Sequence, residues 1–166
     1  MKHTIAALVK NKAGVLARIS GLFARRGFNI DSLAVGVTDD EAISRITIVV
    51  AGDDYIADQV TKQLSKLHDV ITVKVLDENN IVRRDLLLIK VKVNPAQRSE
   101  IVDIAKIMNA EIVDITHTTL TIEFDDRAEK VDLLVDLLSP YKILEIVRTG
   151  SIAIEKGPKT VHDTVE

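Results

Sequence analysis

The sequence predicts an α+β protein made of two consecutive units that share the element order β-α-β-β-α-β. Apolar residues make up 46% of the 166 residues, which is enough for genuine hydrophobic cores. Strand-like apolar runs alternate with segments in which apolar residues recur at the i, i+4, i+7 spacing of a helix. A polar break at 77–80 divides the chain into two stretches, and the same order occurs in each.

The first stretch is expected to hold four strands and two helices. Its strands are apolar runs bounded by polar turns, at 4–9, 29–38, 44–51 and 70–76. The first helix spans 14–26 and has an apolar face made of Val15, Ile19, Leu22 and Phe23. Asp53 and Asp54 can cap the second helix, whose apolar stripe is Ile56, Val60, Leu64 and Leu67.

The second stretch repeats this pattern. Its expected strands lie at 86–93, 111–115, 118–124 and 142–148, with one more short strand at 152–154. Asn94 followed by Pro95 is typical of a helix start, and Pro140 ends the second helix of this unit. We therefore expect two tandem ferredoxin-like domains, 1–77 and 80–157, followed by a flexible tail at 158–166.

Several classes of protein are disfavoured by composition. The chain has no cysteine, hence no disulfide or thiol chemistry, and it has no apolar run long enough for a transmembrane helix. The N-terminus lacks the form of a signal peptide, so we expect a cytoplasmic protein. Residues 77–166 carry 12 Lys and Arg against 17 Asp and Glu, and the strands lack an aromatic cluster, so a nucleic-acid partner is not expected.

Catalytic motifs are equally scarce. The four histidines are scattered without metal-ligand spacing, so we expect no metal site. No phosphate-binding glycine loop and no nucleophile elbow occurs in the sequence. The paired carboxylates at 39–40 and 125–126 fit turns and helix caps better than an acid–base pair. No catalytic residue is predicted.

The loop from Asn11 to Leu16 is the strongest candidate site. It joins an apolar strand to a helix through an Asn and a Gly, and the N–H groups at a helix start can hold a small anion such as a carboxylate. Asn29 supplies a second amide just before the next strand. The alternative interpretation, in which Asn11 caps the helix and Gly14 eases the turn with nothing bound, stays open from spacing alone.

The strand that follows Asn29 suggests a partner. It carries few charges and in this topology lies at an edge of the sheet, where an apolar strand is a pairing hazard unless covered. A second copy pairing edge to edge with two-fold symmetry would cover it. That pairing would also bring Asn29 toward the partner's loop at 11–15. The second unit has no such loop, because Pro95 removes an N–H group there.

The chain resembles the family of acetolactate (acetohydroxyacid) synthase small subunits over nearly its whole length. The run from Asn11 to Leu33 (NKAGVLARISGLFARRGFNIDSL) and the strand from Ser44 to Val50 resemble the ACT domain of that family. Its C-terminal domain is matched by the segments RDLLLIKV at 84–91, AEIVD at 110–114 and RTG at 148–150. The chain departs from the family pattern at Lys12, Ala13 and Val37.

The resemblance implies a regulatory subunit that is not itself an enzyme. It implies a large catalytic subunit as partner, which the small subunit activates, with feedback inhibition by valine in branched-chain amino acid biosynthesis. Thiamine diphosphate, Mg and FAD are then expected in the catalytic subunit, with no cofactor in this chain. It also implies a homodimer formed through the ACT domains, with the amino acid bound at their interface.

By position, the resemblance implies a set of effector-binding residues: Asn11, Ala13, Gly14, Val15, Leu16, Asn29, Ile30 and Gly36. We expect the valine carboxylate to meet the N–H groups of the loop, and its side chain to meet Val15 and Ile30. The alternative is a free-standing amino-acid sensor that regulates a different enzyme or a transcription factor. An intrinsic enzyme is the third choice.

Overall fold

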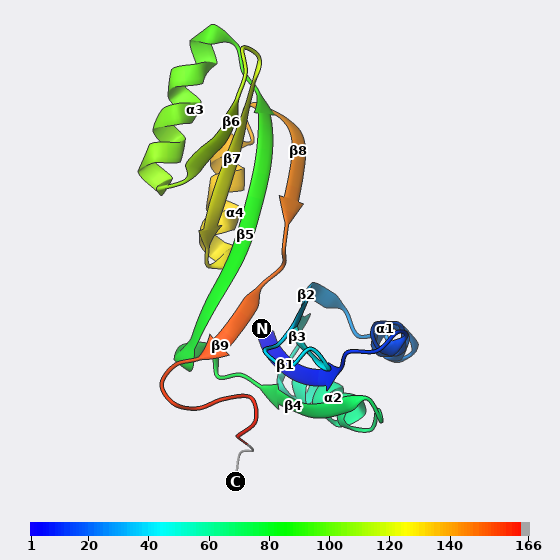
Figure 1. The fold of residues 1–166 in the computed structure, drawn as a ribbon. Coiled ribbons are helices and arrows are strands. Elements are labelled where there is room, and N and C mark those ends of the chain that lie inside the picture. Colours follow the sequence, from blue (N-terminus) through cyan, green and yellow to red (C-terminus); the bar gives the residue numbers. More distant parts are fainter. Residues whose placement is uncertain (164–166) are drawn as a thin grey trace. The chain divides into compact units, whose positions relative to one another are not determined.

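The computed structural model describes residues 1–163, and they divide into two compact units (Figure 1). The first unit contains residues 1–83 together with the segment that begins at Ser151, and the second contains Arg84–Gly150. Within residues 1–163, no helix is both long and apolar enough to cross a membrane. The predicted α+β class with two β-α-β-β-α-β units is confirmed.

The first unit is an antiparallel four-stranded sheet of order β2-β3-β1-β4 with two helices. Its elements are β1 (Lys2–Lys10), α1 (Val15–Arg26), β2 (Ile30–Val37), β3 (Ile43–Ala51), α2 (Asp54–Ser65) and β4 (Val70–Val75). β2 lies at the edge of this sheet, as the sequence predicted. Its outermost residues include the half-exposed side chains of Val35 and Val37.

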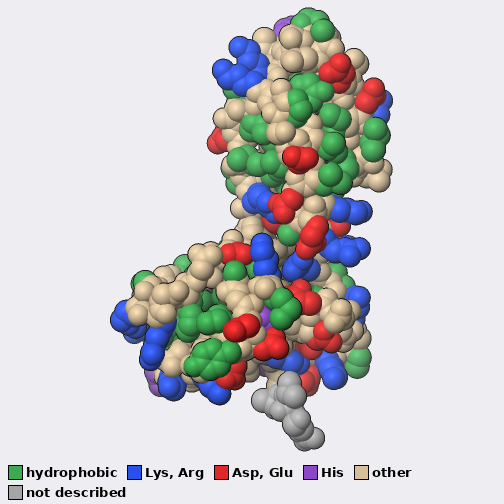
Figure 2. All heavy atoms as spheres, turned by 180° about the vertical axis from the view of Figure 1, so that it is seen from behind, with side chains coloured by type: hydrophobic (Ala, Val, Ile, Leu, Met, Phe, Trp, Pro, Cys, Tyr) green, Lys and Arg blue, Asp and Glu red, His purple; other side chains and the backbone are tan. Residues whose placement is uncertain are grey.

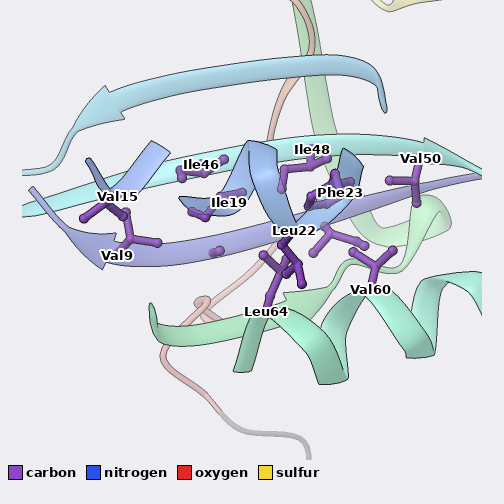
Figure 3. Packing of buried hydrophobic residues seen from close by; sticks show 12 residues of the cluster. Val9, Val15, Ile19, Leu22, Phe23, Ile46, Ile48, Val50, Val60 and Leu64 are labelled. Atoms are coloured by element: carbon purple, nitrogen blue, oxygen red, sulfur yellow. The ribbon is translucent and has the colours of Figure 1, made fainter. Parts of the chain in front are cut away.

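The core of the first unit lies between the sheet and the two helices (Figure 3). Alternate residues of β1 and β3 point toward the predicted apolar faces of α1 and α2. The buried members are Ile5, Ala7, Val9, Val15, Ile19, Leu22, Phe23, Ile46, Ile48, Val50, Val60 and Leu64. Gly27 ends α1 with φ of 68°, and the rings of Phe23 and Phe28 meet edge to face at 5.9 Å.

The other face of this sheet is also covered. Ala6 and Leu8 of β1 pack against Leu76, Ile81, Ala153 and Val161. Because both faces of β1 are buried, its sequence is a continuous apolar run. A strand with only one buried face alternates between apolar and polar residues instead. β9 (Ile152–Glu155) pairs with β5, and the segment after it contributes Val161, which is 7% exposed.

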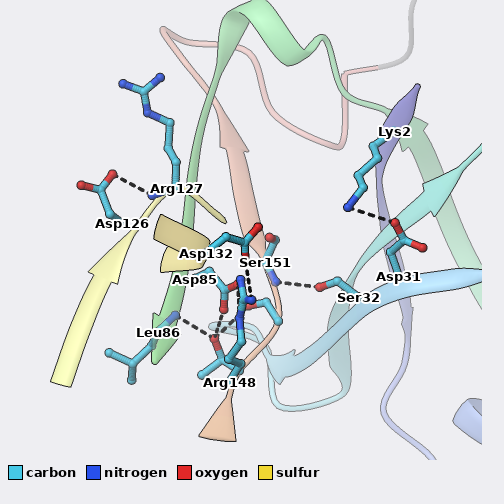
Figure 4. A network of polar contacts seen from close by, with 12 residues as sticks. Lys2, Asp31, Ser32, Asp85, Leu86, Asp126, Arg127, Asp132, Arg148 and Ser151 are labelled. Carbon is cyan, nitrogen blue, oxygen red and sulfur yellow. Dashed lines mark hydrogen bonds and ion pairs between the residues drawn. The ribbon is translucent and has the colours of Figure 1, made fainter. Parts of the chain in front are cut away.

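Side-chain contacts fix this C-terminal segment within the first unit. Lys74 and Glu155 form an ion pair of 2.7 Å in which both side chains are almost buried. Arg45 donates a hydrogen bond of 2.6 Å to the carbonyl of Ala153. The backbone N–H of Ser151 donates to the hydroxyl of Ser32 on β2, as Figure 4 shows.

The predicted boundaries therefore differ from the observed division. Residues 151–157 were expected in the second domain, but the structure groups them with the first. The expected flexible tail begins at Pro158, yet Val161 within it is buried on the sheet. Residues 164–166 of that expected tail lie outside the described part of the chain.

The second unit has the same topology, with strand order β6-β7-β5-β8. Its elements are β5 (Ile81–Lys92), α3 (Pro95–Met108), β6 (Glu111–Ile115), β7 (Thr119–Asp126), α4 (Ala128–Leu138) and β8 (Lys142–Arg148), with a short 3-10 turn η1 (Glu78–Asn80) before β5. β5 alternates between buried and exposed residues, because only one face of this sheet is packed against helices.

The surface of the second unit carries many apolar side chains. Figure 2 shows hydrophobic side chains gathered on one of its faces with few charges among them. Five apolar residues of α4 and β8 are each at least 38% exposed to solvent: Leu133, Leu137, Leu144, Ile146 and Val147. Exposed apolar groups of this density are typical of protein interaction surfaces.

Candidate functional site at the start of the first helix

The loop before α1 leaves several backbone donors without acceptors. Gly14 is the N-cap residue, with φ of 87° and ψ of −10°, and no side chain caps the helix. The N–H of Val15 donates a hydrogen bond to the carbonyl of Lys12. The first hydrogen bond of the helix itself runs from the N–H of Arg18 to the carbonyl of Gly14. Within residues 1–163, the N–H groups of Ala13, Gly14, Leu16 and Ala17 donate to no acceptor.

The N-termini of the other helices are capped or carry an acidic residue. Asp53 accepts a hydrogen bond from the N–H of Ile56 at the start of α2, and Asn94 accepts one from Gln97 at the start of α3. α4 lacks a side-chain cap but carries Glu129 in its first turn. Among the four α-helices of the described chain, α1 alone has neither a side-chain cap nor an acidic residue in its first turn. Its positive end is therefore uncompensated.

Asn11 does not cap α1. Its side-chain amide donates to the carbonyl of Glu41 at 2.8 Å, and its backbone N–H donates to the carbonyl of Ala42 at 2.7 Å. Both acceptors belong to the turn between β2 and β3. Asn11 therefore holds the loop against that turn, and its side-chain oxygen stays available to a ligand.

Val15 and Leu16 have different surroundings. Val15 is 4% exposed and belongs to the hydrophobic core, so its side chain faces the sheet. Leu16 is 43% exposed and is the apolar side chain that the start of the helix presents to solvent. The expected contact between a ligand and the Val15 side chain therefore fits Leu16 better, while Val15 contributes backbone.

Arg18 adds a cation that the sequence interpretation did not include. Its guanidinium forms an ion pair of 2.9 Å with Asp69, and Nη2 lies 4.0 Å from the position that a Cβ on Gly14 would take. The i, i+4 spacing from Gly14 was the signal in the sequence, since residues four apart share a helix face. Its pairing with Asp69 depends on the fold and has no local signature.

Asn29 and Ile30 lie at the start of β2. The Asn29 amide donates to the Asp31 carboxylate at 2.9 Å, and Asp31 also pairs with Lys2 at 3.1 Å (Figure 4). Ile30 is half-buried and packs against the core of the first unit. This side of the candidate site is thus polar at Asn29 and apolar at Ile30.

The strand register separates the candidate residues into two groups. Ile30 lies opposite Val50, at the far end of β3, whereas Gly36 lies opposite Arg45, near the end of β3 that adjoins Asn11. Arg45 and Val50 are five residue steps apart along β3, a span of roughly 16 Å. Within one chain, therefore, Asn11, Ala13, Gly14, Leu16 and Gly36 cluster near one end of the sheet, and Asn29 and Ile30 lie near the other.

The remaining polar groups are structural in character. Within residues 1–163, no cluster of three or more His, Asp or Glu side chains could hold a metal ion. In the second unit, Arg148 forms an ion pair with Asp85 at 2.6 Å and also bonds Asp132 (Figure 4). Asp85 is 3% exposed, which fits a buried support rather than a reactive group.

Comparisons with known proteins agree with this architecture. Residues 5–72 match the family described as "AHAS small subunit-like ACT domain", and residues 84–157 match "Small subunit of acetolactate synthase". The chain is 50% identical over 159 residues to the probable acetolactate synthase small subunit of Archaeoglobus fulgidus, covering 96% of this chain and 99% of that one. It is 45% identical to the acetolactate synthase small subunit of Mycolicibacterium smegmatis, covering 96% and 94% of the two chains.

A solved structure supports the same relationship. The crystal structure of the acetolactate synthase small subunit from Thermotoga maritima superposes with a TM-score of 0.89 and is 36% identical, covering 96% of this chain and 99% of that one. Two family matches that together span most of the chain, and relatives far above 30% identity, point to one family. The chain belongs to the family of acetolactate synthase small subunits.

Proposed function

We propose that this chain activates the catalytic subunit of an acetolactate synthase and makes that enzyme subject to feedback inhibition by valine. The amino acid is proposed to bind at the start of α1. Two lines of support are the family membership and the four N–H donors that lack acceptors at that helix start. Donors grouped at the positive end of a helix suit a carboxylate.

The observation that carries the proposal is the separation of the candidate residues along the sheet. In one chain, Asn11 and Asn29 lie toward opposite ends of the strands. An antiparallel two-fold pairing of two β2 edges would place the Ile30 end of one strand beside the Val37 end of its partner. The effector site is then completed by two subunits, with Asn29 and Ile30 supplied by the second copy.

The edge of the sheet is suited to that pairing. β2 is the outer strand of the first unit, and its Val35 and Val37 side chains are 48% and 57% exposed. A long, exposed apolar edge is normally covered in a folded protein. Because a ligand at this interface would touch both copies, its binding can favour one dimer arrangement, and a coupling of about 1–3 kcal/mol is enough for regulation.

Catalysis is assigned to the partner. The proposal places thiamine diphosphate, Mg and FAD in the large catalytic subunit and gives this chain the effector site. The exposed apolar side chains on α4 and β8 support a role for the second unit in binding another protein. The alternative is that the chain is a free-standing amino-acid sensor that acts on a different enzyme or a transcription factor.

Reconstitution tests the proposal. Acetolactate synthesis by the catalytic subunit is measured with and without this chain, across concentrations of valine, leucine and isoleucine. The proposal expects higher activity in the presence of the chain and inhibition by at least one of the three amino acids. No activation, together with failure of the catalytic subunit to co-purify with the chain, would favour the free-standing sensor.

Calorimetry tests the site itself. Gly14→Asp places a carboxylate among the N–H donors of the loop, and Asn29→His removes the amide proposed to come from the partner. Both variants are expected to keep the fold and most of the activation while abolishing valine inhibition. Unchanged valine binding by the Gly14→Asp chain would rule out this location for the effector.

A further inference from the structure

The outer face of the first unit's sheet contains a pocket that shares no lining residue with the α1 loop, although Asn11 of that loop is hydrogen-bonded to the β2–β3 turn that forms one wall of the pocket. Its volume is about 410 Å³, which lies within the usual range for small-molecule sites. It is formed by the turn between β2 and β3 together with the C-terminal segment. The lining residues are Leu8, Thr38, Asp39, Asp40, Ile43, Arg45, Ile154, Lys159, Thr160, Val161 and His162.

Part of the pocket is apolar. Leu8 and Val161 are almost fully buried, and Ile43 packs beside them in the same cluster. Ile154 also lines the pocket, but its side chain is 59% exposed. Aliphatic groups thus provide a surface for a small aliphatic side chain, and the exposed part of Ile154 is available to be covered by it.

Both polar walls of the pocket are held in place before any ligand binds. In the β2–β3 turn, the N–H of Thr38 donates to the carbonyl of Ile43, and the N–H of Ala42 donates to the Asp40 carboxylate at 2.9 Å. On the C-terminal segment, Lys74 donates to the carbonyl of Thr160 at 3.3 Å. A wall that is already ordered loses little entropy when a ligand binds.

The charges of the two walls differ in sign. Asp39 and Asp40 come from the turn, whereas Lys159 comes from the C-terminal segment and Arg45 from β3. Within residues 1–163, the side chains of Asp39 and Lys159 form neither an ion pair nor a hydrogen bond. Arg45 bonds the Ala153 carbonyl through Nη2, and burial lowers the pKa of Arg45 while Glu155 raises it.

We propose that this pocket is a second ligand site, specific for a small zwitterion with an aliphatic side chain, such as an α-amino acid. Its ammonium faces Asp39 and Asp40, and its carboxylate faces Lys159. The aliphatic group covers Leu8, Ile43 and Ile154. Unlike the site at α1, this one is complete within a single chain and needs no dimer.

The register gives the pocket a connection to the edge strand. Arg45 lies opposite Gly36 on β2, and side chains of paired residues lie on the same face of a sheet. A ligand in the pocket therefore sits beside the strand that is proposed to pair with a second copy. Occupancy of the pocket can consequently influence the stability of that pairing.

An NMR titration of the isotopically labelled full chain tests the proposal, with L-leucine as the probe. Saturable shifts are expected at the amides of 38–45 and 154–162. Those at 154–162 distinguish the pocket from the site at α1, because Asn11 is bonded to the β2–β3 turn and a ligand at 11–16 and 29–30 also perturbs 38–45. 4-Methylpentanoate, which is leucine without its ammonium, and isoamylamine, which is leucine without its carboxylate, are each expected to bind roughly tenfold more weakly than leucine. Equal binding of leucine and either analogue overturns the zwitterion assignment.

Two charge reversals provide a matched pair. Lys159→Glu changes a residue of the pocket, whereas Lys156→Glu changes an exposed lysine three positions earlier that does not line it. Lys159→Glu is expected to weaken the leucine response of 154–162 by roughly tenfold and to leave the response of 11–16 unchanged. Absence of saturable shifts in the pocket amides, or equal titrations of the two variants, overturns the second site. Failure of the first site instead appears at 11–16, with the response of 154–162 retained.

Discussion

The side-chain amide of Asn11 donates a 2.8 Å hydrogen bond to the backbone carbonyl of Glu41. This contact joins the loop before α1 to the turn between β2 and β3, 30 residues later in the chain. Together with the bond from the Asn11 N–H to Ala42, it fixes the position of a loop whose own N–H groups lack acceptors. Asn11 thus orders the proposed site and keeps an oxygen for the ligand.

Replacement of Asn11 by Asp tests this relationship. The variant loses the donor to Glu41 and adds a negative charge where a carboxylate is proposed to bind. Because both groups are exposed, we expect a loss of only about 1 kcal/mol in stability. The valine concentration for half-maximal inhibition should rise at least tenfold, measured by titration of the reconstituted enzyme.

The control for this change is Asn80→Asp, which places the same charge on an exposed asparagine far along the chain. It should leave the valine response as it is in the natural protein. If Asn11→Asp retains normal inhibition by valine, Asn11 contributes nothing to effector binding and its role is confined to loop structure.

Gly14 and Gly27 form a natural comparison, because they stand at the two ends of α1 with φ of 87° and 68°. A Cβ at Gly14 would lie 4.0 Å from Arg18, and one at Gly27 would meet nothing within 4 Å. Alanine at either position is therefore strained by its backbone rather than by contacts, and should cost about 1–2 kcal/mol. Denaturant unfolding measures that cost.

The two alanine variants should differ in regulation. Gly14→Ala restricts the close approach of a ligand to the loop backbone and is expected to weaken valine inhibition markedly. Gly27→Ala, with a similar loss of stability, should keep normal inhibition. Equal effects of the two variants on the valine response would attribute the loss to general destabilisation of α1 instead of the site.

Sequence patterns predicted most of the fold, because most of its helices, caps and turns are determined by residues close together in the sequence. The helix faces, the Asp53 and Asn94 caps and the Gly27 stop each depend on a few neighbouring residues, and all of them occur in the structure. The short strand expected at 152–154 occurs as β9, but its packing on the first sheet through Ala153 could not be predicted. Val161 is an isolated apolar residue in a short, polar segment that carries no periodic signal, so the pattern predicted a tail there.

The candidate site was predicted with the same limits. The loop glycine and both asparagines were found from their position between strand and helix. The helical spacing already placed Val15 on the apolar face of the first helix, and the structure buries it there, so the further expectation that its side chain meets a ligand conflicted with that pattern. The partnership between Arg18 and Asp69 joins residues 51 positions apart and needs the folded chain.

The ion pair between Lys74 and Glu155 should be important for the first unit. Both side chains are at most 11% exposed, so removal of one leaves a buried, unpaired charge on the other. Glu155→Gln is expected to destabilise the unit by about 3 kcal/mol. Hydrogen exchange should show the effect in β1 and β4, while the amides of Arg84–Gly150 in the second unit keep their protection.

Two further variants complete this test. The double change Lys74→Met and Glu155→Leu should be less destabilising than Glu155→Gln, since no charge is left buried. Asp58→Ala breaks the exposed pair between Lys62 and Asp58 and should cost less than about 0.5 kcal/mol. Faster exchange within Arg84–Gly150 after Glu155→Gln would contradict the assignment of the C-terminal segment to the first unit.

Arg148 offers the sharpest comparison in the second unit, because it bonds one buried and one exposed carboxylate. Nε and Nη2 reach Asp85, which is 3% exposed, and Nη1 reaches Asp132, whose side chain is 64% exposed. Burial lowers the pKa of Arg148, but the hydrogen bonds with Asp132 and Asp85 outweigh it and raise that pKa above its ordinary value. The guanidinium therefore stays charged.

Loss of the two carboxylates should consequently have unequal effects. Asp85→Ala is expected to destabilise the second unit by about 3 kcal/mol, at the low end for a broken buried pair because Arg148 itself is one-third exposed. Asp132→Ala should cost at most about 1 kcal/mol, as exposed pairs do. Chemical denaturation followed at amides of β5 and β8 measures both, and equal losses would show that burial of Asp85 does not set the strength of this contact.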